Sequence, residues 1–129
     1  MIEEFYKKIP IIDDEGLFAM EDWLKKSDNF RIMVRELSRL GGSGVAQSTR
    51  KVLYKVLSNE IAQKYSWDGA KQKRSLKSLL VAKAILDSMK GQFQDSKETE
   101  IINIIKIWLV KAKERLKNTE KGRPENIET

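Results

Sequence analysis

The sequence predicts an all-α protein, a compact single domain of about five to six helices. Apolar residues recur at the three- and four-residue spacing of helix faces along most of the chain, and they alternate at strand spacing almost nowhere. A length of 129 residues is enough for one hydrophobic core and short for two. Residues 1–117 are therefore expected to form one helical domain, and residues 118–129, where the apolar period stops, a flexible tail.

The first two expected helices form a helical hairpin. Asp13 or Asp14 caps a helix that reaches about Lys26, and Asp28 caps a second helix that ends at Leu40. The two glycines that follow supply a left-handed stop. The inward stripes at helical spacing are Leu17, Met20 and Leu24 in the first helix and Phe30, Val34 and Leu37 in the second.

Four more helices are expected in the rest of the chain. The third starts near Ser43, and a short fourth starts at Asn59. Ser75 is expected to cap the fifth helix, which Gly91 ends. Ser96, followed by acidic residues in the first turn, marks the start of a sixth helix that runs to about residue 116.

The three tryptophans are expected in or against the core. Trp23 and Trp108 lie on apolar stripes, and Trp108 is expected to be among the most buried residues. Trp67 follows a short helix, where it either packs as a lid on the core or stacks on a nucleic-acid base. The large apolar area of an indole ring favours the core.

The composition narrows the possible chemistry. The chain has no cysteine and no histidine, which excludes disulfides, thiolate nucleophiles, His-centred catalysis and the usual zinc-ligand sets. Acidic residues at 13–15 and 21–22 are explained by favourable interaction with helix dipoles. We therefore expect no catalytic residue, metal, cofactor or small-molecule substrate. The longest nearly apolar run, Ile101 to Val110, is too short for a membrane span of roughly 20 residues, so no membrane is expected as a partner.

The net charge of +6 is unevenly distributed along the chain. Residues 49–90 carry ten basic and three acidic side chains, whereas residues 1–30 carry four basic and eight acidic ones. The middle of the chain therefore supplies nearly all the excess positive charge. Such a concentration indicates a surface for phosphates or for an acidic partner, and a lysine-rich surface that only contacts solvent is the plain alternative.

The strongest candidate site is the connector, residues 66–75, which joins the fourth and fifth expected helices and carries Trp67 beside several cations. Four positive charges within seven residues must lie on the surface. Free amides at a helix start capped by Ser75 would lie near them, and that combination suits a phosphate oxygen. The expected nucleic-acid-binding residues are Lys71, Lys73, Arg74 and Lys77, extended by Arg50, Lys51 and Lys55 of the third helix and by Lys111 and Arg115 of the last.

Several segments together resemble an uncharacterised family, the domain of unknown function 4806. They are Ile9-Pro10-Ile11 before an acidic helix with Trp23-Leu24, then residues 37–42 (LSRLGG), 57–60 (LSNE) and 65–69 (YSWDG), and finally Trp108-Leu109 with Ala112 and Arg115. The resemblance covers about residues 9–116. It implies a transposon-related or chromatin-associated protein and assigns no activity.

Residues 45–116 are also distantly similar to the BEN domain, an α-helical DNA-binding module. The similarity rests on a helix that ends near residue 60, the glycine- and lysine-containing connector, a helix that opens at Ser75, and a last helix with Trp108 and Arg115. It implies a BEN-like bundle in which basic residues near the end of the last helix contact DNA. Here those residues are Lys111, Lys113, Arg115 and Lys117.

Two functions of different classes follow from these observations. The first is a non-catalytic nuclear module that binds DNA, or as second choice structured RNA, mainly through phosphates. The alternative is a protein-interaction or self-association domain of a chromatin-associated factor, in which Glu21 and Asp22 on the acidic first helix of one copy meet the basic middle of another. An enzyme is disfavoured by the lack of histidine, cysteine and a convincing carboxylate pair.

Overall fold

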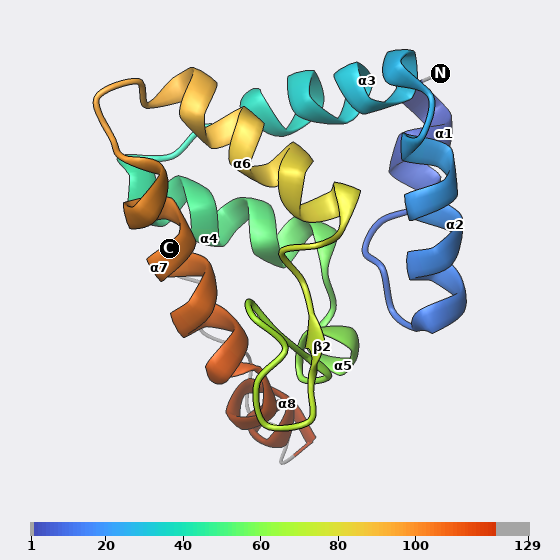
Figure 1. The fold of residues 1–129 in the computed structure, drawn as a ribbon, viewed down its shortest axis with the longest axis vertical. Helices are drawn as coiled ribbons and strands as arrows, with labels where there is room; N and C mark the ends of the chain where they lie inside the picture. Colours follow the sequence, from blue (N-terminus) through green and yellow to red (C-terminus); the bar gives the residue numbers. More distant parts are fainter. Residues whose placement is uncertain (1, 121–129) are drawn as a thin grey trace.

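The computed structural model of the chain describes residues 2–120. Within that range the chain forms eight helices and one pair of two-residue β-strands, so the predicted all-α domain is confirmed (Figure 1). The elements are α1 (Ile2–Lys7), α2 (Asp14–Leu24), α3 (Ser27–Ser38), α4 (Val45–Val56), α5 (Asn59–Ala62), β1 (Tyr65–Ser66), β2 (Arg74–Ser75), α6 (Leu80–Gln92), α7 (Glu98–Val110) and α8 (Ala112–Glu120).

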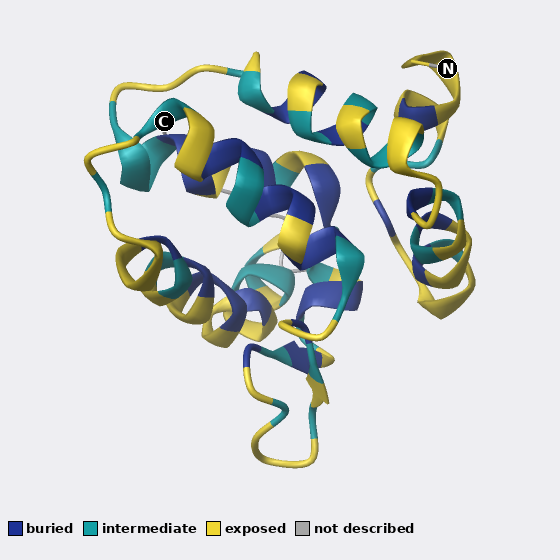
Figure 2. Cartoon of the chain, turned by 45° about the horizontal axis from the view of Figure 1, so that its top comes forward, coloured by how far each residue is buried: buried dark blue, intermediate teal, exposed yellow. Residues whose placement is uncertain are grey.

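Helix α6 lies at the centre of the domain. It packs against α2, α3, α4 and α7, and its buried face runs almost the whole length of the helix (Figure 2). Two alanines on that face, Ala82 and Ala84, let the neighbouring helices approach closely, while Ile85 and Met89 fill the space between them. The core therefore joins the N-terminal helices to α7 and fixes the surface on which the candidate site lies.

The tryptophan predictions agree with the structure. Trp108 is 3% exposed and Trp67 is 8% exposed, so both belong to the core. Trp23 is half-buried against the core, and its ring stacks on Phe5 with centroids 6.2 Å apart. Trp67 is therefore not available as a stacking platform for a base.

The N-terminal hairpin forms as expected, with one addition and one correction: Asp28 does not cap α3, because the helix begins at Ser27 and its N-cap residue, Lys26, makes no side-chain cap hydrogen bond. Asp13 caps α2, since its carboxylate accepts a hydrogen bond from the Gly16 amide at 2.8 Å. Helix α1 was not predicted. It buries Phe5 and places the Tyr6 hydroxyl 2.7 Å from Glu36 of α3, to which it donates a hydrogen bond. That hydrogen bond is the main reason why the pKa of Tyr6 is raised.

The predicted start of the fifth helix is wrong. Ser75 lies in β2, and α6 begins five residues later at Leu80. Ser75 does not start a helix because the end of the connector pairs in parallel with its beginning: the Leu76 amide donates to the Ser66 carbonyl at 2.8 Å, and the Lys77 amide donates to the Trp67 carbonyl at 3.2 Å. A turn at residues 77–78 then leads into α6. Ser75 therefore belongs to a strand pair and not to a helix start, and the residues around it give no sign of that pairing.

The last expected helix is two helices. Helix α7 ends at Val110, and α8 starts at Ala112 after a corner at Lys111. Helix α8 continues to Glu120, past the expected end of the domain at residue 117. The rest of the expected tail, residues 121–129, lies outside the described residues. Between residues 2 and 120, no helix has the length and apolar character needed to cross a membrane.

Candidate nucleic-acid interface

The connector is a closed, well-tied loop. Its base is the parallel pairing of Tyr65 with Arg74 and of Ser66 with Ser75. Its first turn is held by Ser66, whose Oγ accepts hydrogen bonds from the Gly69 and Ala70 amides, both at 2.8 Å. Buried Trp67 anchors the loop to the core. These ties hold the backbone of the loop, so the Cα atoms at its tip are presented from a supported scaffold.

The tip of the loop carries Lys71, Gln72 and Lys73. Lys71 and Gln72 adopt the left-handed backbone conformation, with φ of 57° and 64°, which turns the chain sharply. Lys71 is exposed and Lys73 is half-buried. Neither ammonium group has an ion-pair partner among residues 2–120, so both charges are open to an external anion.

The other two predicted cations of the connector are engaged internally. Arg74 forms an ion pair with Asp14 of α2, Nη1 to Oδ1 at 2.7 Å. Hydrogen bonds with Tyr65 and with Asp14 raise the pKa of Arg74. Lys77 pairs with Asp68 at 2.9 Å, and Lys106 of α7 approaches the same carboxylate at 3.7 Å.

These ion pairs fasten the connector to α2 and α7. All of the paired side chains are about half exposed, and an exposed pair typically contributes about 0–1 kcal/mol. Arg74 and Lys77 therefore orient the loop at little energetic gain. An external phosphate would have to compete with Asp14 or Asp68 for them.

The predicted cations of α4 have no hydrogen bond or ion pair with the connector within residues 2–120. Helix α4 buries its other side against α6 and α7 and leaves Arg50, Lys51 and Lys55 exposed. Lys51 Nζ donates a hydrogen bond to the Leu40 carbonyl at 3.0 Å, which ties it to the end of α3. These residues form a second basic surface on α4.

Arg115 has a structural role that the sequence did not suggest. Its guanidinium lies 4.0 Å from the centroid of the Trp108 ring and 5.4 Å from that of Tyr54 on α4. It donates hydrogen bonds to the Trp108 carbonyl at 2.8 Å and to Asn59 Oδ1 at 2.9 Å. These contacts hold the α7–α8 corner against α4 and α5. Lys111, at the corner itself, is exposed.

The two predicted partner-binding residues differ in their surroundings. Glu21 accepts hydrogen bonds from the first two amides of α6, Leu80 at 2.9 Å and Val81 at 2.7 Å, one on each carboxylate oxygen. It thus caps a helix whose own N-cap residue, Leu79, has no side-chain acceptor. Asp22 is exposed, and its carboxylate lies 3.6 Å from Lys25.

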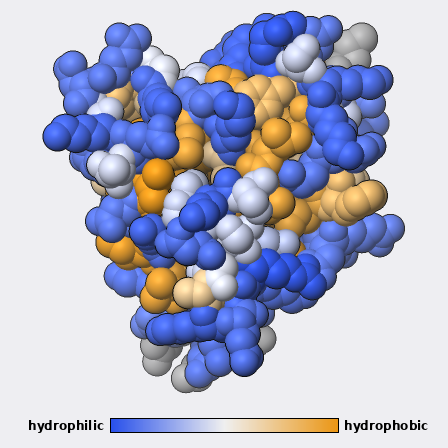
Figure 3. Space-filling view, in the orientation of Figure 1, coloured by the Kyte–Doolittle hydropathy of each residue, from blue (hydrophilic) through white to orange (hydrophobic). Residues whose placement is uncertain are grey.

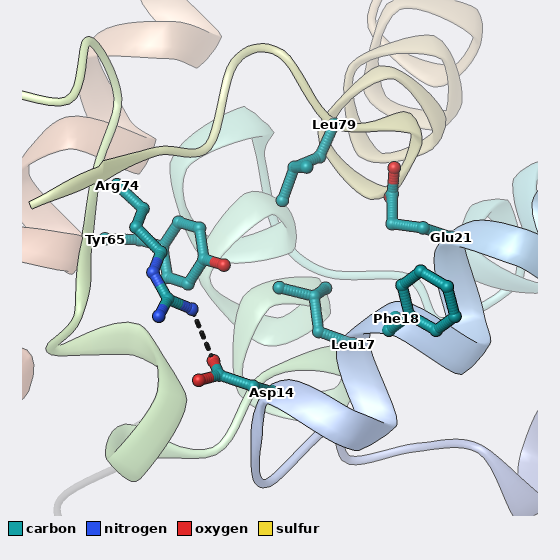
Figure 4. Close-up of a pocket in the computed structure, with 7 residues that line it drawn as sticks. All are labelled: Asp14, Leu17, Phe18, Glu21, Tyr65, Arg74 and Leu79. Atoms are coloured by element: carbon teal, nitrogen blue, oxygen red, sulfur yellow. Dashed lines mark hydrogen bonds and ion pairs between the residues drawn. The ribbon is translucent and has the colours of Figure 1, made fainter.

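An open groove of about 390 Å³ lies beside the base of the connector (Figure 4). Phe18 of α2, at its rim, is 75% exposed. Sequence reasoning missed this residue, although a signal was present: a large aromatic one position off the inward stripe of α2. The lining residues are Asp14, Leu17, Phe18, Glu21, Tyr65, Arg74 and Leu79.

A comparison with models of known protein families shows to which family the chain belongs. The model of the domain of unknown function 4806 (DUF4806) matches residues 4–88, more than half of the chain. The chain belongs to this family. No curated protein and no solved structure matches it.

The DUF4806 match contains most of α1, all of α2 to α5, the connector and most of α6. The groove, the loop tip and the Glu21 cap therefore all lie within the family's domain. Helices α7 and α8, with Lys111 and Arg115, lie beyond the matched residues. The resemblance was expected to reach residue 116, whereas the family match ends at residue 88. No cluster of three or more potential metal-ligating residues occurs in residues 2–120.

Proposed function

We propose that this DUF4806 domain is a non-catalytic module that binds DNA through its phosphates, within a nuclear protein of chromatin or transposon origin. Structured RNA is the second choice of nucleic acid. The observation that carries the proposal is the loop tip, where Lys71 and Lys73 are held on a tied loop without an internal ion-pair partner.

A tied loop favours binding because its backbone loses little conformational freedom when its cations meet a phosphate. The backbone ties at Ser66 and the parallel strand pair already restrict the tip. Each lysine that neutralises a phosphate also releases a condensed counterion from DNA, which makes the affinity depend on salt.

The expected contribution of a helix N-terminus is not part of the proposal. The amides at the start of α6 already donate to Glu21, and a phosphate at that place would meet a carboxylate. Arg115 is likewise left out, because its guanidinium is held by Trp108 and Asn59. The supporting cations are the exposed Arg50, Lys55 and Lys111, which would extend the contact beyond the tip.

The test is the double charge reversal Lys71→Glu with Lys73→Glu, measured by titration of duplex DNA across a range of salt concentrations. Loss of two phosphate contacts should lower the log–log salt slope by about 1.8, because each contact contributes about 0.9 for duplex DNA. Affinity should fall at every salt concentration. The free energy of unfolding should change by less than about 0.5 kcal/mol, because neither side chain has an internal partner to lose.

The matched control is Lys7→Glu with Lys26→Glu, which makes the same change in net charge on two exposed residues, one in α1 and one between α2 and α3. This control should keep most of the affinity and the full salt slope. Equal losses in the two variants would show that only net charge matters. A parent chain that binds no duplex even at low salt would refute the proposal, and duplex RNA of the same sequence, titrated in parallel, ranks the two nucleic acids.

The second candidate function is a protein-interaction or self-association domain of a chromatin-associated factor. The observation that favours it is exposed Phe18 at the rim of the groove, because large apolar side chains exposed beside a hollow are typical of interaction sites.

A further inference from the structure

The groove has two walls of opposite charge. One wall is α2, which contributes Asp14, Leu17, Phe18 and Glu21. The other is formed by Tyr65 and Arg74 of the strand pair and by Leu79 before α6. Figure 4 shows the α2 residues on one side and Arg74 with the Tyr65 ring on the other, joined at the base by the Asp14–Arg74 ion pair.

The α2 wall combines an exposed aromatic residue with acidic neighbours. Glu15 and Asp22 lie three residues before and four residues after Phe18, so helical spacing places them on the same outward stripe. Both are exposed. Apolar surface also gathers between α2 and α6 on the face seen in Figure 3, with hydrophilic residues around it. An apolar anchor within a polar rim is the usual anatomy of a protein interface.

The opposite wall is basic. The Arg74 side chain is 59% exposed despite its ion pair with Asp14. Lys73, the residue before it, is half-buried and has no ion-pair partner among the described residues. The hydroxyl of buried Tyr65 and the side chain of Leu79 complete a surface that is apolar at the bottom and positive at the edge.

We propose that this groove is the interface of a homodimer, in which Phe18 of each copy enters the groove of the other. A two-fold interface requires one patch that is complementary to itself. This patch meets the requirement, because a two-fold axis brings the acidic α2 wall of one copy onto the basic wall of its partner, and does so twice. A different protein would need to carry the same pair of opposite charges at the same spacing.

The proposal specifies the self-association candidate, and Lys73 belongs both to the dimer surface and to the proposed DNA-binding tip. Its tests are nevertheless independent of the proposed DNA binding, because every measurement is made without nucleic acid. The first experiment is sedimentation of the complete 129-residue chain over a range of concentrations at low and high salt. We expect a reversible dimer whose dissociation constant rises with salt, since charges across the interface are screened. A chain that stays monomeric at the highest concentration and lowest salt overturns the proposal.

The second experiment replaces the anchor. Phe18→Ser should weaken the dimer by about thirtyfold or more, as loss of a central aromatic anchor does in other interfaces. Val110→Ser is the matched control, because Val110 is 73% exposed on α7, away from the groove. It should leave the dimer unchanged. A dimer that survives Phe18→Ser, or that depends on Val110 instead, lies on another surface and refutes the proposal.

The third experiment tests the two-fold arrangement of charge. Glu15→Lys with Asp22→Lys, and separately Lys73→Glu with Arg74→Glu, should each abolish the homodimer, because like charges then face each other at both edges. A mixture of the two variants restores opposite charges at both edges and should form a heterodimer. Circular dichroism checks that each variant is folded. Folded variants that remain monomeric in the mixture would contradict the pairing of these walls.

Discussion

The amides at the start of a helix and the cations of the connector are the two features from which the sequence predicted one phosphate-binding site, and the structure treats these two features differently. The start of α6 is occupied from within, because Glu21 of α2 accepts hydrogen bonds from its first two amides. The loop tip has no such partner, and Lys71 and Lys73 extend from a tied backbone without an internal ion pair. The difference shows that a charge pattern becomes a candidate binding surface only where the fold leaves it unsatisfied.

The cations show the same division. Arg115 is fixed by an aromatic ring and two hydrogen bonds, and it joins α8 to the rest of the domain. Lys71 was grouped with it in the predicted site, yet it makes no side-chain contact of this kind within residues 2–120. Substitutions of the internal group should therefore change stability, whereas substitutions of the loop tip should change binding alone.

The largest expected effect is that of Trp108→Ala. Trp108 is 3% exposed and lies under the Arg115 guanidinium, with its ring edge-on to Tyr54 at 5.5 Å. The substitution removes a large buried ring and leaves a cavity, so the free energy of unfolding should fall by about 3 to 5 kcal/mol. Urea denaturation measures it. Near-native stability would mean that the α7–α8 corner contributes little to the core.

The next effect is that of Glu21→Ala, which should cost about 2 kcal/mol because the Leu80 and Val81 amides lose their acceptors. Glu21→Gln keeps one strong acceptor and should cost less. Asp95→Ala, in the exposed loop between α6 and α7, is the control and should be nearly neutral. Hydrogen exchange at the Leu80 and Val81 amides should accelerate in Glu21→Ala alone. If hydrogen exchange at these two amides is unchanged in Glu21→Ala, Glu21 does not cap the start of α6.

The smallest effect concerns the ion pair between Asp68 of the connector and Lys77, two residues after the connector ends. The hydrogen bond from Lys77 is the main reason why the pKa of Asp68 lies below its ordinary value of 3.8, and Lys106 adds to it. Because the folded-state pKa is lowered, the pair stabilises the fold above the unfolded-state pKa, and this contribution is lost as pH falls through the folded-state value.

An NMR titration of the Asp68 carboxyl measures this shift. Lys77→Gln should move the Asp68 pKa back toward 3.8, while the loop-tip variant Lys71→Glu, which has no contact with Asp68 in the structure, should move it far less. Equal shifts in both variants would mean that the pKa reports the general field of the connector and not the specific pair.

The helical pattern of the sequence was a sound guide to most of the fold. The stripe of Leu17, Met20 and Leu24 is buried as expected, and Asp13 caps α2. These features depend on interactions within a few residues, which helical spacing and capping chemistry describe well. Helix α1 was missed because six residues with one buried side chain, Phe5, give too short a pattern to recognise.

The candidate site was less predictable from the sequence, because contacts between residues far apart in the chain decide which of its charged groups are already paired. Ser75 has the chemistry of a cap, but the parallel pairing of β2 with β1 holds it in a strand. The true cap, Glu21, lies 59 residues before Leu80 in the chain, and no local pattern connects the two. The role of Arg115 depends likewise on Asn59 and Trp108, which reach it only once α5, α7 and α8 are packed.

The sequence by itself determined the all-α class, the burial of Trp67 and Trp108, and the uneven distribution of charge along the chain. These follow from residue type and short-range spacing, because apolar area must be buried and charges must stay near water or a partner. Only the tertiary structure decided which charges are already satisfied. Pairing between a carboxylate and two amides, or between a guanidinium and a ring, requires contact within a few ångströms, and packing of distant helices alone creates that proximity.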